Sequence, residues 1–286
     1  WVEQLVAEST GKDGRRLLPV DGEAIGPAAL ARADRAFAVT PDLDRALGQA
    51  IAHTDRPAWL LDLPAPAGLG AAFLRWEIAT AAASAVLGVD PFDEPNVSEA
   101  KQATAEVLEQ ALAQGSFPED APLLVAGDTR LWAAGAAPAA LRGTPADAAA
   151  ALRGLLDAAG PSDYLALLAY LHATPAIEAR LARVRVAAAA GSGIATTLGY
   201  GPRFLHSTGQ LHKGGPATGI YLQLTAAEEP DLAIPGERYS FGMLRRAQAA
   251  GDYRTLARHG RRVLRLDLGA DPIGALDALA SRLERD

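Results

Sequence analysis

The first segment equipped for chemistry is residues 7–14, Ala-Glu-Ser-Thr-Gly-Lys-Asp-Gly. It places Glu8 at the end of a predicted helix, directly before a glycine-rich turn that holds Lys12. A carboxylate held near a ligand in this way can act as a general base. The alternative is an exposed acid at a helix end. The Gly11-Lys12 pair is not a phosphate-binding P-loop, because the upstream glycine and the strand of that motif are missing.

The second segment, residues 88–101, is an acid-rich loop that leads into a helix carrying Lys101. Two prolines restrict the loop, and a helix that starts at residue 97 places Lys101 about one turn further on. A cation at this position can stabilise negative charge that develops on a substrate. The alternative is a solvated helix start capped by Asn96 or Ser98.

The third segment, residues 199–216, directly follows a predicted strand and sets polar side chains among glycines. A hydrophobic core does not require such a run, whereas a polar site at a strand end does. A histidine such as His206 can shuttle protons near neutral pH. Its neighbour Gln210 suits the orientation of the loop or of a substrate hydroxyl, and His212 and Lys213 either contact phosphate or cap the turn. The candidate site residues of this segment are Arg203, His206, Ser207, Thr208, Gln210 and Lys213.

Two other catalytic classes fit this segment poorly. The nucleophile elbow G-x-S-x-G of a Ser-His-Asp hydrolase does not occur. A zinc site is disfavoured because His206 and His212 have no third histidine or carboxylate beside them in the loop.

The lysines set the three segments apart from the rest of the chain. Of 27 lysines and arginines, the lysines are Lys12, Lys101 and Lys213, one in each segment. An ammonium kept in a chain that otherwise uses arginine indicates a position that a planar guanidinium does not serve. Compositional bias with three chance survivors is the alternative.

The composition limits the classes of protein to consider. With 286 residues, 49% hydrophobic and 21% charged, the chain has the composition of one large or two modest folded domains and not of a disordered protein. Its formal net charge of −7 argues against a nucleic-acid partner. The absence of cysteine excludes disulfides and thiol chemistry, and no run of about 18 apolar residues predicts a membrane partner. A cytoplasmic location is expected.

The elements that must position the three segments alternate along the chain. Apolar runs bounded by turn residues predict strands at 35–39, 59–63, 123–126, 164–170, 194–198, 219–224 and 263–268. Helical spacing predicts helices at 1–7, 42–52, 73–87, 97–114, 175–190, 241–250 and 273–283. This alternation predicts an α/β fold that is doubly wound, with mainly parallel sheets and helices on both faces, in two lobes.

The predicted domains are residues 1–114, the C-terminal portion of one lobe; residues 115–162, a linker and helical segment; and residues 163–286, a second α/β lobe carrying the His/Gly-rich loop. Ligands of such sheets bind at the carboxyl ends of strands, so the loops after Leu198 and Leu63 are where chemistry is expected. The nearly apolar helix 73–87 is expected between a sheet and a neighbouring lobe, and Trp59 and Trp76 are expected in the core.

The three segments resemble those of the phosphoglucose isomerase (glucose-6-phosphate isomerase) family, and the third is most similar to the bifunctional transaldolase/phosphoglucose isomerase branch. The pattern Glu-Ser-x-Gly-Lys at residues 8–12 is similar to the family segment with the catalytic base. Residues 88–101 resemble the family's C-terminal signature with its active-site lysine. His206, Gln210 and Gly214 match a His-x3-Gln-x3-Gly spacing around the family's ring-opening histidine.

The chain also departs from the family pattern. The histidine segment comes after the other two, whereas in the ordinary isomerases it lies between them. The family's phosphate-binding Ser/Thr-rich loop belongs to an upstream lobe, for which Ser207 and Thr208 are partial substitutes here. Because the chain opens on Trp1 inside an amphipathic pattern, we expect a piece of a longer polypeptide that includes this missing upstream lobe.

The resemblance implies a sugar-isomerase-like fold and the interconversion of glucose 6-phosphate and fructose 6-phosphate. Glu8 would move a proton through a cis-enediol, His206 and Lys101 would open the sugar ring, and Lys101 or Arg203 would stabilise the enediolate. A sugar phosphate is the expected substrate, and no cofactor and no metal are expected. The family completes each site with a histidine from a neighbouring subunit, so a homodimer is one expectation; an appended lobe that supplies His206 within the chain is the other. The chain by itself is expected to be inactive.

Three alternatives stay open at this point. The chain can be a non-catalytic sugar-phosphate-binding domain of a multifunctional enzyme, or a purely structural segment of such an enzyme. Transaldolase activity would need a Schiff-base lysine on a barrel strand, and none of the three lysines lies on a predicted strand.

Overall fold

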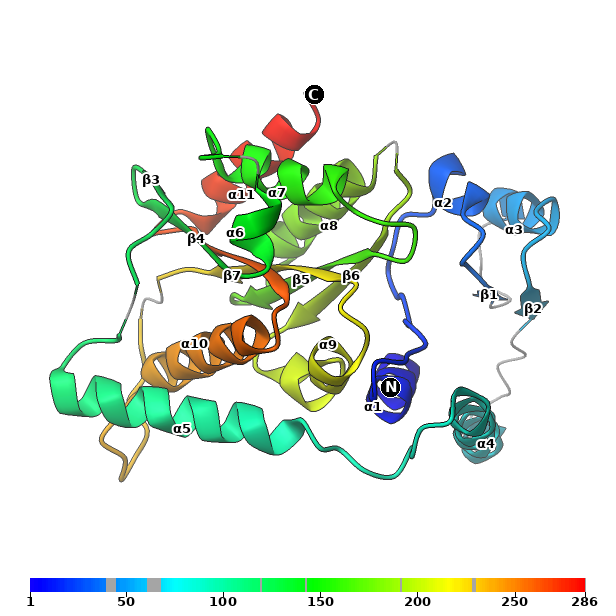
Figure 1. The fold of residues 1–286 in the computed structure, drawn as a ribbon, viewed down its shortest axis with the longest axis horizontal. Helices are drawn as coiled ribbons and strands as arrows, with labels where there is room; N and C mark the ends of the chain where they lie inside the picture. Colours follow the sequence, from blue (N-terminus) through cyan, green and yellow to red (C-terminus); the bar gives the residue numbers. More distant parts are fainter. Residues whose placement is uncertain are drawn as a thin grey trace.

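The computed structural model describes residues 1–39, 45–60, 68–118, 120–141, 143–190, 192–227 and 230–285. A six-stranded sheet in the order β3-β4-β8-β7-β5-β6 forms its centre (Figure 1). Its parallel strands are β5 (Tyr164–Tyr170), β6 (Ala195–Tyr200), β7 (Gly219–Thr225) and β8 (Arg262–Asp267). The predicted α/β class with a mainly parallel sheet is confirmed.

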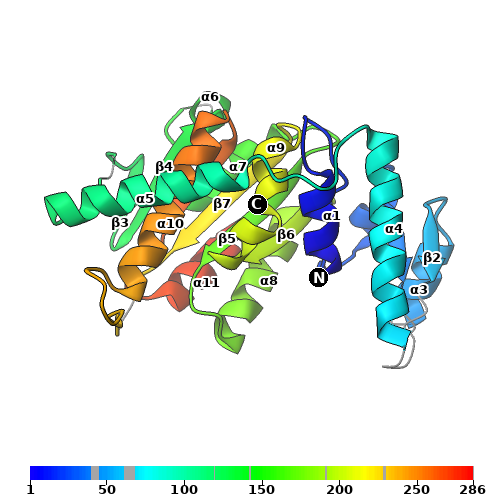
Figure 2. The same cartoon turned by 90° about the horizontal axis from the view of Figure 1, so that it is seen from below.

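Helices cover both faces of this sheet because its central strands are apolar on both sides. Leu165, Leu167 and Ala169 of β5 share one core with α7 (Ala148–Asp157), α8 (Pro175–Ala189) and α11 (Pro272–Leu283). The alternate residues of β5 pack in a second core with side chains of α1 (Val2–Thr10), α9 (Gly209–Gly214) and α10 (Phe241–Arg258). The α5 helix (Val97–Gln114) lies across α10 (Figure 2). Every residue of β5 and β7 is buried, as strands covered on both faces require.

The segment expected as a linker, residues 115–162, takes part in this sheet. It contains β3 (Leu124–Ala126) and β4 (Thr129–Gly135), and β4 pairs antiparallel with β8 from Arg130 to Gly135. It also contains α6 (Ala137–Ala140) and α7. The β4 strand escapes detection by pattern because its alanines and glycine lack the β-branched residues typical of strands.

A second, smaller sheet lies on the other side of α1. It pairs β1 (Phe37–Val39) with β2 (Ala58–Leu60) in parallel, with α2 (Pro27–Ala31) before them and α3 (Arg45–Ala52) between them. Trp59 is 48% exposed, so its expected place in the core is wrong. The predicted continuation of this strand and the loop after Leu63 lie outside the described residues.

The α4 helix (Leu69–Leu87) is apolar on all sides but buries little of its apolar surface. It packs against α1, and its buried side chains are Thr80 and Ser84. Five of its larger apolar side chains, by contrast, are exposed: Leu69, Phe73, Leu74, Ile78 and Val86. The helix therefore exposes apolar side chains on several sides, at the position that the sequence predicted to lie between a sheet and a neighbouring lobe. Within the described ranges, none of the helices is both long enough and apolar enough to cross a membrane.

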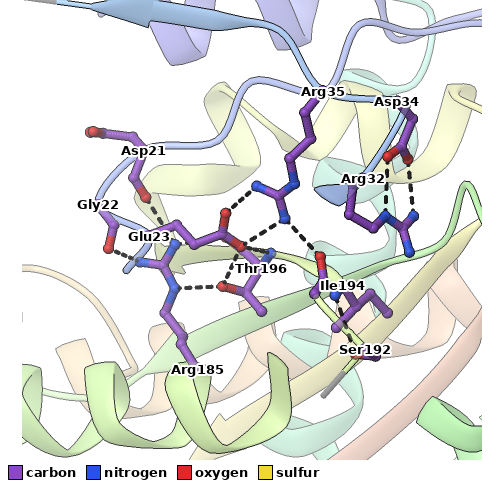
Figure 3. Close-up of polar contacts among 11 residues, drawn as sticks. Asp21, Gly22, Glu23, Arg32, Asp34, Arg35, Arg185, Ser192, Ile194 and Thr196 are labelled. Carbon is purple, nitrogen blue, oxygen red and sulfur yellow. Dashed lines mark hydrogen bonds and ion pairs between the residues drawn. The ribbon is translucent and has the colours of Figure 1, made fainter. Parts of the chain in front are cut away.

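A buried polar network fastens the stretch before β1 to the six-stranded sheet (Figure 3). Glu23 accepts hydrogen bonds from the backbone N–H of Thr196 on β6 (2.7 Å) and from its hydroxyl (3.2 Å), and it forms an ion pair with Arg35. Arg185 on α8 donates to the Thr196 hydroxyl (3.1 Å) and to the carbonyls of residues 21–22 (2.9 Å each). Because these groups are buried, each depends on the others for hydrogen bonds that water does not supply.

Removal of the Glu23 carboxylate should leave the Arg35 guanidinium without its ion-pair partner and the backbone N–H of Thr196 without its acceptor. We expect Glu23→Ala to lower the free energy of unfolding by about 3–5 kcal/mol in urea denaturation followed by circular dichroism. As a control, Glu109→Ala on the exposed face of α5 should change it by less than about 0.5 kcal/mol. Equal effects of the two substitutions would contradict this role of the network.

Candidate functional site

The side chain of Gln210 joins the three segments that the sequence singled out. It lies in the first turn of α9 and is 1% exposed. Its Nε2 donates to the carbonyl of Gly11 (3.2 Å) and to Oδ1 of Asn96 (2.9 Å), and its Oε1 accepts from the backbone N–H of Asn96 (3.0 Å). One amide thus binds the turn after α1 and the loop before α5 to the His/Gly-rich segment.

Two glycines allow the backbones to approach this closely. A Cβ on Gly11 would overlap Leu211, and a Cβ on Gly214 would lie 2.6 Å from Nε2 of Gln210 and 2.9 Å from the carbonyl oxygen of Gly11. The backbone N–H of Gly14 also donates to the carbonyl of Gly214 (2.9 Å). Both glycines serve close packing between segments far apart in the sequence.

Lys12 fixes the acid-rich loop to the same place. Its Nζ lies 2.7 Å from Oδ1 of Asp93 and also donates to the Asp93 carbonyl, and the lysine is 1% exposed. The lysine of the first segment therefore connects the first and second segments and does not face solvent.

Glu8 is half-buried on α1 and hydrogen-bonds to the side chains of Gln4 and Glu94. Burial, as the largest cause, raises the pKa of Glu8, and the hydrogen bond and negative charge of Glu94 raise it further. The hydrogen bond from Gln4 and the charge of Lys12 act in the opposite direction. A carboxyl group whose pKa is raised toward neutrality can both accept and return a proton.

His206 lies on an element that is hydrogen-bonded to α1, and Lys101 lies on a helix that contacts the His206 element. The Nε2 of Gln4, one helical turn before Glu8, donates to the carbonyl of His206 (2.9 Å). His206 ends a short 3-10 helix (Arg203–His206), which lies beside α5, and Lys101 is in the second turn of α5. Both side chains are exposed. The structure thus brings together the segments that carry Glu8, His206 and Lys101.

The remaining candidates of the third segment occupy different environments. Arg203 is exposed, and Ser207 is half-buried with its hydroxyl donating to the carbonyl of Phe204 (3.2 Å). Thr208 is 7% exposed at the start of α9. These three lie next to His206 in the chain.

Lys213 points away from this group. Its Nζ lies 2.8 Å from Oδ1 of Asp252 on α10, and both side chains are 1% exposed. A buried ion pair of this kind leaves no cation for a substrate phosphate, so we exclude Lys213 from the candidate site. The neighbouring His212 is buried among aromatic rings, and burial lowers its pKa well below the ordinary value, so it stays neutral.

Four residues of this region had no functional role assigned from the sequence: Gln4, Asp93, Glu94 and Asn96. Gln4 has a signal in the sequence, because a residue four positions before Glu8 lies on the same face of a helix. The other three belong to the acid-rich loop, but their partners are 81 to 114 residues away in the chain, which no local pattern reveals. Among the residues that the structure describes, no group of three or more His, Cys, Asp or Glu is arranged to hold a metal ion.

Comparisons with known proteins add little to this geometry. No protein-family model matches the chain, and no curated protein matches it. Among solved structures, the chain is similar to a hypothetical protein from Thermus thermophilus, with 14% sequence identity and a TM-score of 0.41 over 99% of this chain and 73% of that chain. This likeness carries no argument about activity, so the proposal below depends on the chain's own residues.

Truncation of Gln210 should loosen the junction of the three segments. We expect Gln210→Ala to lower the free energy of unfolding by about 1–3 kcal/mol, because it leaves buried groups of Gly11 and Asn96 without partners. The matched control is Gln102→Ala, which removes an exposed amide that bonds only within α5, to Glu106. If chemical denaturation gave the same loss for both variants, Gln210 would not have this role.

The raised pKa of Glu8 makes a prediction about stability and pH. The folded state binds the Glu8 proton more tightly than the unfolded state does, so protonation of Glu8 stabilises the fold. This stabilisation is complete below the ordinary pKa of 4.5 and is lost as the pH rises through the pKa of the folded state. Glu8→Gln stays uncharged. Its melting temperature relative to the unsubstituted chain should therefore rise between pH 4 and pH 7.

The control for this titration is Ala105→Ser on the exposed side of α5, which adds no titrating group. Its melting temperature should keep a constant offset over the same range in differential scanning calorimetry. A constant offset for Glu8→Gln as well would contradict the raised pKa.

Proposed function

We propose that this chain contributes the acid–base residues of an aldose–ketose isomerase acting on glucose 6-phosphate and fructose 6-phosphate. One observation carries the proposal: a half-buried glutamate with a raised pKa lies on a helix that is hydrogen-bonded to the segment bearing His206 and tied through Gln210 to the loop before Lys101. The resemblance of the same three segments to the isomerase family supports it.

In the proposed reaction, the Glu8 carboxylate takes the proton from C2 of the open-chain aldose. The electron pair of that bond forms the C1–C2 double bond, and the aldehyde oxygen gains a proton, so that a cis-enediol results. Glu8 then returns its proton to C1 while the hydroxyl on C2 loses one and becomes the ketone. One carboxyl group serves both carbons, which requires a pKa closer to neutrality than that of an ordinary glutamate.

Other residues of the region support this step. His206 and Lys101 are proposed to open the ring, by protonating the ring oxygen and accepting the anomeric hydroxyl proton. The charge of Lys101 or Arg203 stabilises the enediolate. Ser207 and Thr208 are proposed phosphate contacts. Glu94 and Gln210 are positioning residues, the first for the Glu8 proton and the second for the segments themselves.

The proposed partner is a further α/β lobe of the same polypeptide, upstream of this chain. Two observations support it. The parallel sheet β1–β2 has two strands in the part of the chain that the structure describes, whereas parallel sheets are stable when they are larger and covered on both faces. Five large apolar side chains of α4 are exposed, and so much exposed apolar surface on one helix is characteristic of a segment that another part of the protein covers. The alternative is that a second copy of the chain covers this surface and forms a homodimer.

A non-catalytic sugar-phosphate-binding domain is the second candidate function. It accounts for the hydroxyl and cationic side chains beside His206. It gives no reason for the pairing of Glu8 with Glu94, because a carboxyl pair repels a phosphate.

The test is an isomerase assay on a polypeptide that includes the upstream lobe, with fructose 6-phosphate as substrate and coupled oxidation of the glucose 6-phosphate formed. Glu8→Gln should lower kcat by about 10²–10⁴-fold with little change in sugar-phosphate binding by calorimetry. Glu109→Gln on α5 is the control and should keep full activity.

The outcomes separate the alternatives. Unchanged turnover in Glu8→Gln would refute the role of this residue, and binding without turnover in the unsubstituted protein would favour the binding domain. Residues 1–286 alone should show no turnover. Robust activity of that chain would contradict the need for an upstream lobe and leave the role of Glu8 intact.

A further inference from the structure

A cavity of about 440 Å³ lies at the carboxyl ends of the parallel strands, away from the residues discussed above. Its lining includes Tyr170, Thr225 and Asp267, which are the last residues of β5, β7 and β8. The connection after β5 runs through α8 on one face of the sheet, and the connection after β7 runs through α10 on the other. The cavity is therefore at the point where the winding of the sheet reverses, which is where open α/β sheets bind ligands.

Four arginines line this cavity: Arg130, Arg245, Arg246 and Arg265. Two of them are held by aromatic rings, since the Arg246 guanidinium lies 4.4 Å from the centre of the Phe117 ring and that of Arg265 lies 5.2 Å from the Trp132 ring. A cation–π contact of this kind holds a guanidinium group near the ring, and the group carries five N–H donors in one plane. Such planar donors match the oxygens of a phosphate or a carboxylate.

The carboxylates of the lining have their own hydrogen bonds. Asp231 accepts from the backbone N–H of Gly242 (2.8 Å) in the first turn of α10. Asp267 accepts from the Thr225 hydroxyl (2.9 Å) and from the backbone N–H two residues further on (3.0 Å). Asp128 is the third acid among the lining residues that the structure describes. Because Asp231 already caps α10, an anion in this cavity would be held by side chains and not by the helix end.

The Tyr170 hydroxyl is the second, independent indication of a ligand. The residue is 2% exposed, and its hydroxyl has no hydrogen-bond partner among the described residues. Burial raises its pKa well above the ordinary value, so the group stays an O–H donor. A buried hydroxyl without a partner is costly in a folded protein, and a ligand oxygen would remove that cost.

We propose that this cavity binds a small organic phosphate ester. The arginines and the Tyr170 hydroxyl donate to the phosphate oxygens, and the organic part of the ligand packs against Phe117 and Met243. A phosphate suits several guanidinium groups better than a carboxylate does, because it offers three terminal oxygens instead of two. The inference is independent of the isomerase proposal, since the two sets of residues have no member in common.

The test is isothermal titration calorimetry of residues 1–286 with phenyl phosphate, inorganic phosphate and benzoate. Phenyl phosphate should bind at least about tenfold more tightly than either of the other two. Tyr170→Phe should weaken phenyl phosphate binding by about tenfold, which is the loss expected for one hydrogen bond to a charged group. The melting temperature of the ligand-free Tyr170→Phe chain should stay the same or rise, because the substitution removes a hydroxyl that has no partner.

Arg246→Gln should weaken binding as well, and Arg75→Gln on the exposed side of α4 should leave it unchanged. Equal binding of phenyl phosphate and inorganic phosphate would refute the contact with the organic part, and tighter binding of benzoate would refute the phosphate. No binding, or binding that Tyr170→Phe does not weaken, would overturn the site. Glu8→Gln should bind phenyl phosphate normally; loss of binding in that variant would place the ligand at Glu8 and overturn this inference without touching the isomerase proposal.

Discussion

The rest of the candidate site depends on the side-chain amide of Gln210. An amide has both a donor and an acceptor end, and here they serve Gly11 and Asn96, which come from two segments that are not connected to α9 in sequence. Inside the protein these bonds have no competition from water, and each group that lost its partner would stay buried and unpaired. The position of α1, and with it Glu8, follows from this junction and from the close approach that Gly11 and Gly214 permit.

Charge is used in two ways in this region. The ion pairs Lys12–Asp93 and Lys213–Asp252 connect elements, and both lysines are buried while Asp93 is exposed. The fully buried pair Lys213–Asp252 serves as a constraint on geometry more than as a source of stability. Glu8, by contrast, is half-buried beside the carboxyl group of Glu94. Burial and this neighbouring negative charge both disfavour the charged form of Glu8. The fold thus pairs two lysines with acids, and these ion pairs connect segments. It also raises the pKa of one carboxyl group, Glu8, which suits that group to acid–base chemistry.

The smaller sheet and α4 have apolar surface that no other described part of the chain covers. Arg185, Glu23 and Thr196 hold the stretch before β1 against the large sheet, so the small sheet is attached firmly on one side. Its two strands and the exposed apolar side chains of α4 lack a comparable cover among the described residues. An apolar helix whose buried residues are Thr80 and Ser84 is consistent with an environment in which its outer side is also covered.

The sequence by itself determined the alternation of strands and helices, including β5 at residues 164–170 and α5 at residues 97–114, because strands and helices buried on a sheet must be apolar at recognisable spacings. It also identified the three segments that meet. It missed β4, which pairs with a strand more than a hundred residues away. Only the tertiary structure decided that Lys12 and Lys213 are buried ties while Lys101 is exposed, because the carboxylate that pairs with a lysine comes from a distant part of the chain. The same holds for the pKa of Glu8, which burial and Glu94 set after folding.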